Sequence, residues 1–562
     1  MGIFLHLSIS KSVTKEEWDA VYQESLELVD AFELCEARKV KVCGIETFCF
    51  VRTKERERIR YHDSDDVIIW WNCIGDYDSM CCAENYFLPR DLKRYYGDDD
   101  IKDNKTKKSH ISKDPLSFIV RDKNDDAYDD DNGYYSHGDS FYNLWGGKTQ
   151  GELYHIYLLA IGCMIESRLG SKAYVYGDIT RGQCVNAVEQ ANKFLKNKID
   201  VPDSCDAKRF IRRIRTLGLS EKDEIAAIDK YYLGKKDAGF GNLMRETFSD
   251  TAFDEYWCER FKDKPPGTIA FHEALGDYII WGFDFEKLCR HICINDEKEA
   301  AEFVNAIMES KLHIKDKDCR DYLKINPDNP GPYGIGKLFA NFLFRGAANK
   351  KIDAFIPIET IRSVLCSGIS EKYPVNVNEL IDNYLAEEES QKKPEKPVDE
   401  MTDEEMGEAL KRDASAVYTE LVENKTDKLK EYDIYHYDFL KFYQKGDSIN
   451  PEIEKTLAMI LRFGKELLEK PYFARLMKEP SEELCKWMAS QAEEGYIMLR
   501  DSDWERIYTE ITGDKGKFAK YYSLLKIDSG ANDVNAFITA LLVNPELYER
   551  ALELDEEIGA DD

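Results

Sequence analysis

The chain has 562 residues, with 108 Asp or Glu against 78 Lys or Arg, and a formal net charge of −30 at pH 7. Hydrophobic residues make up 43% and aromatic residues 12%, which supplies enough apolar material for packed cores and excludes a globally disordered chain. A chain of this length exceeds what one hydrophobic core supports, so we expect about two to four domains.

The charge and the cysteines bear on partners and location. Strong net acidity repels nucleic acids and anionic membranes, so we do not expect either as a partner, except for nucleic acid at a local basic site. The sequence shows no apolar run of about 18 residues and no secretory signal pattern at its start. The 15 cysteines, an odd number, suit reduced thiols. We therefore expect a cytoplasmic protein.

Residues 1–148 predict an α+β domain. Residues 3–9 form an expected strand, and a capping box at Thr14 begins a helix whose apolar side chains recur every three or four residues. Residues 39–51 and 67–74 are rich in Val, Ile, Phe and Trp, which predicts two further strands.

A charge-dense stretch interrupts this domain before a helical middle part begins. Residues from about 97 to 140 carry many charges and few apolar anchors, which predicts an acidic surface insertion. Residues 149–386 predict a mainly helical domain with one short strand near 173–176. The helices expected there cover 152–168, 180–196, 206–217, 221–232, 285–294, 298–310 and 337–344.

Residues 387–401 predict a linker because they are charged, contain two prolines and have almost no apolar side chain to bury. Residues 402–562 then predict an all-helical C-terminal domain, which we expect proteolysis at the linker to release. Its helix-start signals are capping boxes at Thr402 and Ser502 and Asn-Pro pairs at Asn450 and Asn544. The fold class is therefore α+β: a mixed N-terminal region with a small sheet, a large helical body and a C-terminal all-helical domain.

One segment resembles a phosphate-binding loop. Between Gly331 and Leu338 the glycines and Lys337 have the required spacing, and an apolar helix follows. However, Leu338 stands where a hydroxyl would bind magnesium, and turn sequence stands where a buried strand should precede the loop. We keep Lys337 as a candidate anion-binding residue, against the simpler interpretation of a turn that leads into a core helix.

The metal-site motifs are incomplete as well. His272 and Glu273 begin like a zinc-protease helix, but Gly276 occupies the place of the second histidine. Cys289 and Cys293 would supply at most half a zinc site, and a packed helix face explains them better. We predict no metal and no cofactor.

A basic segment, Lys208 to Arg215, contains five cations in eight residues. In a helix its apolar residues share one stripe, while Arg209, Arg212 and Arg213 lie three and four residues apart and could form a fork for phosphate or carboxylate. The alternative is that these arginines pair with the abundant acids across a domain interface, which we prefer because arginine suits such ion pairs.

Asp178 and Arg181 complete the candidate anion-binding set. They lie at a strand-to-helix turn, where functional side chains often emerge. Asp178 has a second interpretation as the N-cap of the following helix.

No catalytic constellation in the sequence is complete. Our leading hypothesis is a non-catalytic intracellular interaction or regulatory protein that recognises another protein. The alternative is an enzyme that acts on a phosphorylated small molecule or a nucleic acid through the basic helix 208–215. Convergence of the candidate residues in one concave site would favour the enzyme, and scattered positions would favour the interaction protein.

Overall fold

The computed structural model describes residues 3–52, 55–60, 63–93, 114–120, 141–266, 268–292, 294–315, 354–390, 431–432, 437–527 and 532–561. Helices account for 61% and strands for 14%, which confirms the α+β class predicted from the sequence. The chain divides into two compact units. Met1–Pro202 together with Asp403–Asp562 forms the first unit, and Asp203–Thr402 forms the second.

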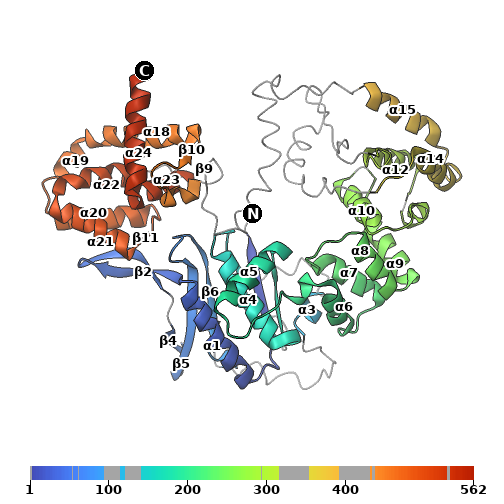
Figure 1. Ribbon diagram of the computed structural model, residues 1–562, viewed down its shortest axis with the longest axis horizontal. Coiled ribbons are helices and arrows are strands. Elements are labelled where there is room, and N and C mark those ends of the chain that lie inside the picture. Colours follow the sequence, from blue (N-terminus) through green and yellow to red (C-terminus); the bar gives the residue numbers. More distant parts are fainter. Residues whose placement is uncertain are drawn as a thin grey trace. The chain divides into compact units, whose positions relative to one another are not determined.

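The N-terminal part of the first unit carries two sheets (Figure 1). Among the described residues, β1 lies between β7 and β8 and is antiparallel to both. The larger sheet has the order β11–β3–β2–β5–β4 with β6 on β5, and its strand β11 (Leu499–Arg500) comes from the C-terminal part of the unit. The elements of this part are β1 (Phe4–Ser10), α1 (Lys15–Ala31), β2 (Leu34–Val42), β3 (Ile45–Arg52), β4 (Arg56–Arg60), β5 (Asp63–Asp76), β6 (Cys82–Pro89), α3 (Leu116–Ile119), β7 (Phe141–Lys148), α4 (His155–Leu169), β8 (Ala173–Gly177) and α5 (Arg181–Phe194).

The small sheet is organised around β1, whose side chains alternate between two faces. Leu5, Leu7 and Ile9 lie on one face and are fully buried. Helix α4 approaches this sheet closely at Gly162, where an added Cβ would lie 2.8 Å from Cγ2 of Val175. A larger residue at 162 would therefore push α4 away from β8.

The start of α1 is confirmed as predicted. The Thr14 hydroxyl accepts a hydrogen bond from the Glu17 amide at 3.2 Å, and the Glu17 carboxylate accepts one from the Thr14 amide at 2.8 Å. The single strand predicted over 39–51 is wrong, because β2 and β3 form an antiparallel hairpin there. Cys43 and Gly44 make its turn with φ of 50° and 82°, the left-handed pair that two-residue hairpins favour.

The C-terminal part of the first unit is mainly helical and also contains three two-residue strands among its described residues. Its elements are β9 (Glu431–Tyr432), a 3-10 helix (Tyr437–Phe442), β10 (Ser448–Ile449), α18 (Pro451–Leu468), α19 (Pro471–Leu476), α20 (Ser481–Glu494), β11 (Leu499–Arg500), α21 (Asp501–Gly513), α22 (Phe518–Leu525), α23 (Asn532–Val543) and α24 (Pro545–Asp561) (Figure 1).

This C-terminal part shares a hydrophobic core with the larger sheet. Strand β11 pairs in parallel with β3, so that Leu499 lies opposite Cys49. The fully buried Trp504 donates a hydrogen bond from its indole nitrogen to the Phe48 carbonyl at 2.8 Å. Side chains of the β2–β3 hairpin, including Phe50, belong to the same cluster of buried residues as those of the C-terminal helices.

Two of the predicted helix starts are confirmed in this part. The Asn450 side chain accepts from the Glu452 amide at 2.9 Å before Pro451, and the Asn544 side chain accepts from the Leu547 amide at 3.0 Å. The capping box predicted at Ser502 is wrong, because α21 already begins at Asp501 and has no side-chain cap. Thr402 lies outside the described residues.

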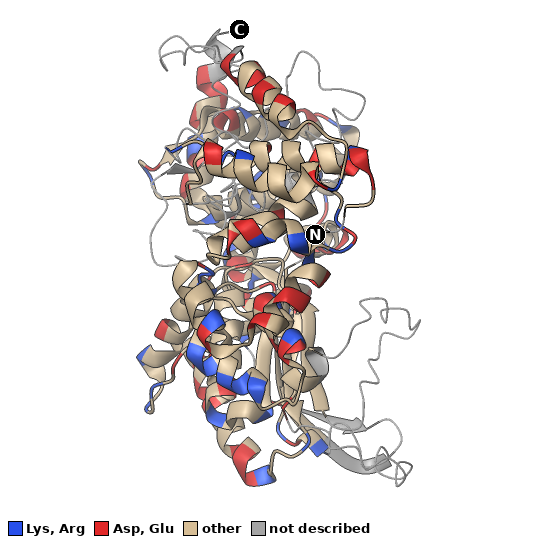
Figure 2. Ribbon diagram, turned by 90° about the vertical axis from the view of Figure 1, so that its right-hand side faces the viewer, with Lys and Arg blue, Asp and Glu red and all other residues tan. Residues whose placement is uncertain are grey.

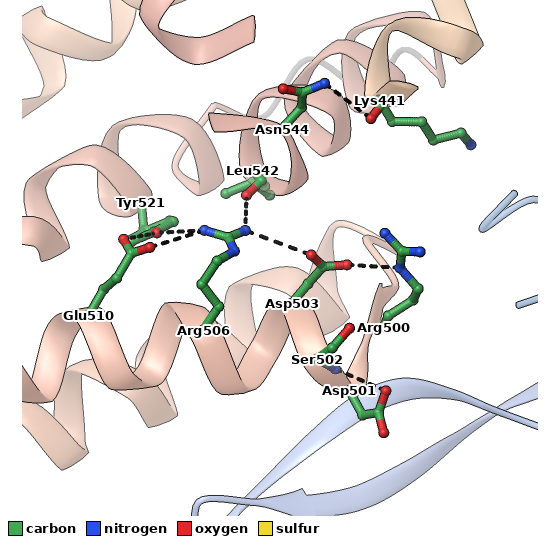
Figure 3. A network of polar contacts seen from close by, with 10 residues as sticks. All are labelled: Lys441, Arg500, Asp501, Ser502, Asp503, Arg506, Glu510, Tyr521, Leu542 and Asn544. Carbon is green, nitrogen blue, oxygen red and sulfur yellow. Dashed lines mark hydrogen bonds and ion pairs between the residues drawn. The ribbon is translucent and has the colours of Figure 1, made fainter. Parts of the chain in front are cut away.

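A polar network holds α21 against its neighbours (Figure 3). Arg506 donates to Glu510 at 3.2 Å and to the backbone carbonyl of Leu542 at 2.8 Å, and it lies 3.8 Å from Asp503. Asp503 also accepts from Arg500 at 3.2 Å. Arg506 therefore ties α21 to the last turn of α23, and Asp503 and Glu510 of the same helix pair with its guanidinium.

The second unit is a helical body with an aromatic centre. The ring of Trp257 lies 5.0 Å from Tyr278, 5.3 Å from Phe283 and 5.4 Å from Trp281, mostly edge to face. The predicted helix 285–294 is shorter than expected, since a 3-10 turn precedes the four-residue α11. The helices are α6 (Ala207–Arg215), α7 (Glu221–Tyr231), α8 (Ala238–Thr247), α9 (Asp250–Phe261), α10 (Ile269–Ile280), α11 (Leu288–His291), α12 (Glu297–Glu309), α14 (Ile358–Leu365) and α15 (Val377–Ser390).

The predicted insertion and linker lie largely outside the described residues. Of the insertion, residues 114–120 are described and include α3. Of the linker, residues 387–390 belong to α15, where Glu388 accepts hydrogen bonds from Lys311 at 2.6 Å and from His313 at 3.0 Å. The predicted domain boundaries stay predictions, although the compact units group the C-terminal helices with the N-terminal sheets.

The shared core changes what we expect from proteolysis. After cleavage between residues 391 and 401, the C-terminal fragment should stay bound to the N-terminal fragment, because separation would expose the core around Trp504. Size-exclusion chromatography of the nicked protein should show one species, which separates only in denaturant. A folded C-terminal fragment that elutes alone in native buffer would show that the shared core does not hold the parts together.

Candidate functional site

The predicted basic helix is present as α6. Its N-cap is Asp206, whose side chain accepts from the Arg209 amide at 2.9 Å. Phe210, Ile211 and Ile214 are buried and form the apolar stripe expected from their spacing. The amphipathic helix predicted for this segment is therefore confirmed.

The arginines of α6 are engaged with carboxylates of their own unit. Asp203, in the turn just before the helix, lies 3.6 Å from Arg209 and 3.5 Å from Arg213. The Arg213 side chain is 4% exposed, and the exposed Arg212 donates to the Lys208 carbonyl at 3.3 Å. Arg209 and Arg213 therefore share a carboxylate from the preceding turn. The pairing predicted across a domain interface stays a prediction.

Asp178 and Arg181 belong to the first unit, whereas the α6 arginines belong to the second. Asp178 accepts from the Phe4 amide at 2.9 Å, and its own amide donates to the Phe4 carbonyl, so it closes the end of the β1–β8 pair. The interpretation of Asp178 as a helix cap is wrong, because Thr180 caps α5. Arg181 is an exposed residue of the first turn of α5. Lys337 lies outside the described residues.

Asp178 lies in a neighbourhood with two histidines. The His6 ring stacks on Tyr176 with centroids 4.8 Å apart. His155 is fully buried, and its Nδ1 lies 2.7 Å from the Thr149 hydroxyl. Burial lowers the pKa of His155 to about 4, and the charge of Asp178 opposes this shift only in part. His155 is therefore a neutral core residue near pH 7.

The described ranges contain no group of three or more His, Cys, Asp or Glu side chains placed to hold a metal ion. The prediction of no metal concerns the whole chain and stays a prediction. Across those same ranges, no helix has the length and apolarity needed to cross a membrane.

The structure has an exposed apolar surface that was not predicted from the sequence. Met459 and Phe463, one turn apart on α18, are 68% and 49% exposed, and Tyr472 on α19 is 39% exposed. We call Met459 and Phe463 the α18 face. The opposite side of α18 is the buried one, with Leu457 and Ile460 in the core. A helical projection of residues 451–468 would have placed Met459 and Phe463 away from that buried stripe.

Helix α18 is held firmly in place. Asp555 of α24 lies 3.1 Å from Arg462 and 2.6 Å from Lys465. Burial alone would raise the pKa of Asp555, but hydrogen bonds and charges from Lys465 and Arg462 outweigh it and hold that pKa below its usual value. At Gly464 an added Cβ would lie 3.0 Å from Cβ of Ser523, so α18 and α22 are closely packed. The α18 face is thus a fixed surface on a packed helix.

On the side of the molecule that Figure 2 shows, acidic and basic residues are interspersed along the described helices. No family model, no curated protein and no solved structure matches the chain. The functional argument therefore rests on the geometry of the residues described above.

The ion pairs of α6 lead to a stability prediction. Replacing Arg213 with Gln should lower the free energy of unfolding by about 1–2 kcal/mol, a value reduced for the partial exposure of Asp203. The matched change Arg212→Gln removes an exposed guanidinium and should alter it by less than about 0.5 kcal/mol. Chemical denaturation measures both. Equal effects would show that Arg213 does not support the fold.

His155 leads to a prediction about pH. Its folded pKa of about 4 lies below the ordinary value of 6.5, so between these values the unfolded chain binds a proton that the folded chain does not. The free energy of unfolding should therefore fall as the pH drops from 6.5 to 4, by up to about 3 kcal/mol from this group. His155→Gln should flatten that part of the stability curve. An unchanged slope would contradict a neutral buried imidazole.

Proposed function

We propose that this chain is a non-catalytic interaction protein that recognises another protein through the α18 face. The observation that carries the proposal is the exposure of Met459, Phe463 and Tyr472 on two consecutive helices. Met459 and Phe463 lie one turn apart on α18, so they present neighbouring apolar groups, and Met, Phe and Tyr are enriched at protein interfaces.

The energetics agree with a recognition surface. Covering the Phe463 side chain with a partner would contribute roughly 1.5–3 kcal/mol from buried apolar area, with a similar amount from Met459. Because Asp555 and Ser523 fix α18 from its other sides, these side chains are presented on a helix that does not have to order on binding.

The enzyme alternative receives less support from the geometry. It relied on the α6 arginines as a fork for an anionic substrate, and two of them, Arg209 and Arg213, share Asp203. A carboxylate between them competes with any anionic ligand for the same donors. The cytoplasmic location and a regulatory role form part of the proposal and rest on the composition of the chain.

The test is recovery of a partner from the native cell. We expect the tagged full chain to co-purify with a protein in stoichiometric amount, and the double change Met459→Ser with Phe463→Ser to reduce that recovery at least tenfold, since two apolar anchors are lost. Quantitative mass spectrometry measures the recovery. Melting temperature should stay nearly unchanged, because both side chains are exposed.

The matched control is Phe355→Ser, which removes another exposed aromatic side chain, 44% accessible and on the second unit. It should leave the co-purifying protein in place. Recovery that survives the α18 double change, or that falls equally with the Phe355 change, would contradict recognition through the α18 face.

A further inference from the structure

The Lys520 side chain of α22 lies against two aromatic rings. Its Nζ is 4.0 Å from the centroid of the Tyr548 ring, near the start of α24, and 5.4 Å from that of Tyr521. The residue is half-buried, and within the described part of the chain its Nζ makes no hydrogen bond and no ion pair. Lysines usually keep the ammonium group in water or pair it with an acid. Lys520 thus carries a partly dehydrated charge that the described residues do not pair.

Two carboxylates act on Lys520 electrostatically, but neither binds it. Glu510 of α21 accepts hydrogen bonds from the Tyr521 hydroxyl and from Arg506, the latter at 3.2 Å (Figure 3). Glu549 of α24 is exposed and forms no ion pair with Lys520. The ammonium group therefore has no acid that offsets its charge at short range.

This environment favours the neutral amine. Burial lowers the pKa of Lys520 from 10.5 to about 8, the cations Arg506 and Lys517 add to that fall, and the two carboxylates oppose it. The face of the Tyr548 ring attracts the ammonium group, but such an attraction is weak at a half-exposed site and offsets the fall only in part. Roughly a tenth of the Lys520 side chains are therefore neutral at pH 7, against less than about 0.1% for an ordinary lysine.

We propose that Lys520 is a modification site that is acylated by an acyl thioester. The lone pair of Nζ attacks the thioester carbonyl carbon, an N–C bond forms and the C–S bond breaks. The sulfur leaves as a thiol and takes up the proton that the nitrogen loses, so the step needs no oxidant or reductant. The product is a neutral amide. This inference rests on Lys520 and its surroundings and does not depend on the α18 face.

The surroundings of Nζ favour acyl transfer over imine formation with an aldehyde. A protonated imine keeps a positive charge at a place where the described residues supply no acceptor. Acylation removes that charge, and the flat amide can stack on the Tyr548 ring that the ammonium group contacts in this structure. Loss of a partly dehydrated charge therefore favours the amide product.

The test compares Lys520 with Lys517, an exposed lysine directly before the same helix. The full chain is treated with S-acetyl-N-acetylcysteamine, an uncharged acetyl thioester, and quantitative mass spectrometry follows acetylation of each lysine. At about pH 7.5, Lys520 should react about tenfold faster, because its large neutral fraction outweighs the weaker nucleophilicity of a less basic amine. Its rate should level off above about pH 8, whereas ordinary exposed lysines still gain neutral amine at about pH 9.5.

The matched variant is Lys520→Arg, which keeps a positive charge beside the Tyr548 ring. It should abolish acetylation at position 520 and leave that of Lys517 unchanged. Reaction of Lys520 no faster than that of Lys517, or a Lys520 rate that rises through about pH 9.5 without levelling off, would overturn the proposal. A parallel reaction with propanal and cyanoborohydride tests the other chemistry. A preference for Lys520 over Lys517 that is larger with the aldehyde than with the thioester would assign the site to imine formation instead.

Discussion

The packing of Trp504 against the β2–β3 hairpin joins the two ends of the chain in one core. Its indole hydrogen bond to the Phe48 carbonyl and the β11–β3 pairing connect residues more than 400 positions apart in sequence. Closing such a long loop costs only slightly more entropy than closing a shorter one, so a well-packed core can offset it. The buried side of α18, which carries the α18 face, packs in this core.

Carboxylates that bridge two cations organise much of the remaining structure, and two of them, Asp503 and Asp555, are buried. Asp203 faces Arg209 and Arg213, Asp503 faces Arg500 and Arg506, and Asp555 faces Arg462 and Lys465. Each bridge engages two cations with one acid. The arginines in these bridges thus stabilise the fold by pairing with carboxylates of the same chain.

Local signals in the sequence predicted local structure well, and contacts between distant residues could not be predicted in the same way. The caps at Thr14 and Asn450 involve only neighbouring residues and were found. The hairpin turn at Cys43 was missed because a cysteine and a glycine inside an apolar run resemble a strand. The pairing of the two-residue β11 with β3 has no local signature. The arginines of α6 were identified, but their bridging carboxylate was not. The left-handed backbone of Tyr496 was not predicted, because glycine commonly takes this conformation at a helix end and Gly495 directly precedes Tyr496.

The net charge of the chain and the α18 face would affect different steps of binding. Charge attraction acts over about a Debye length, roughly 8 Å at physiological salt, and mainly increases the rate of encounter. Apolar contacts form only when the two protein surfaces meet, and they mainly slow dissociation of the complex. In this scheme the net charge of −30 favours the approach of a basic partner, and Met459 and Phe463 retain that partner if it also carries apolar side chains. A partner that is basic but not apolar would bind fast and leave fast, so the α18 face sets which basic proteins stay bound.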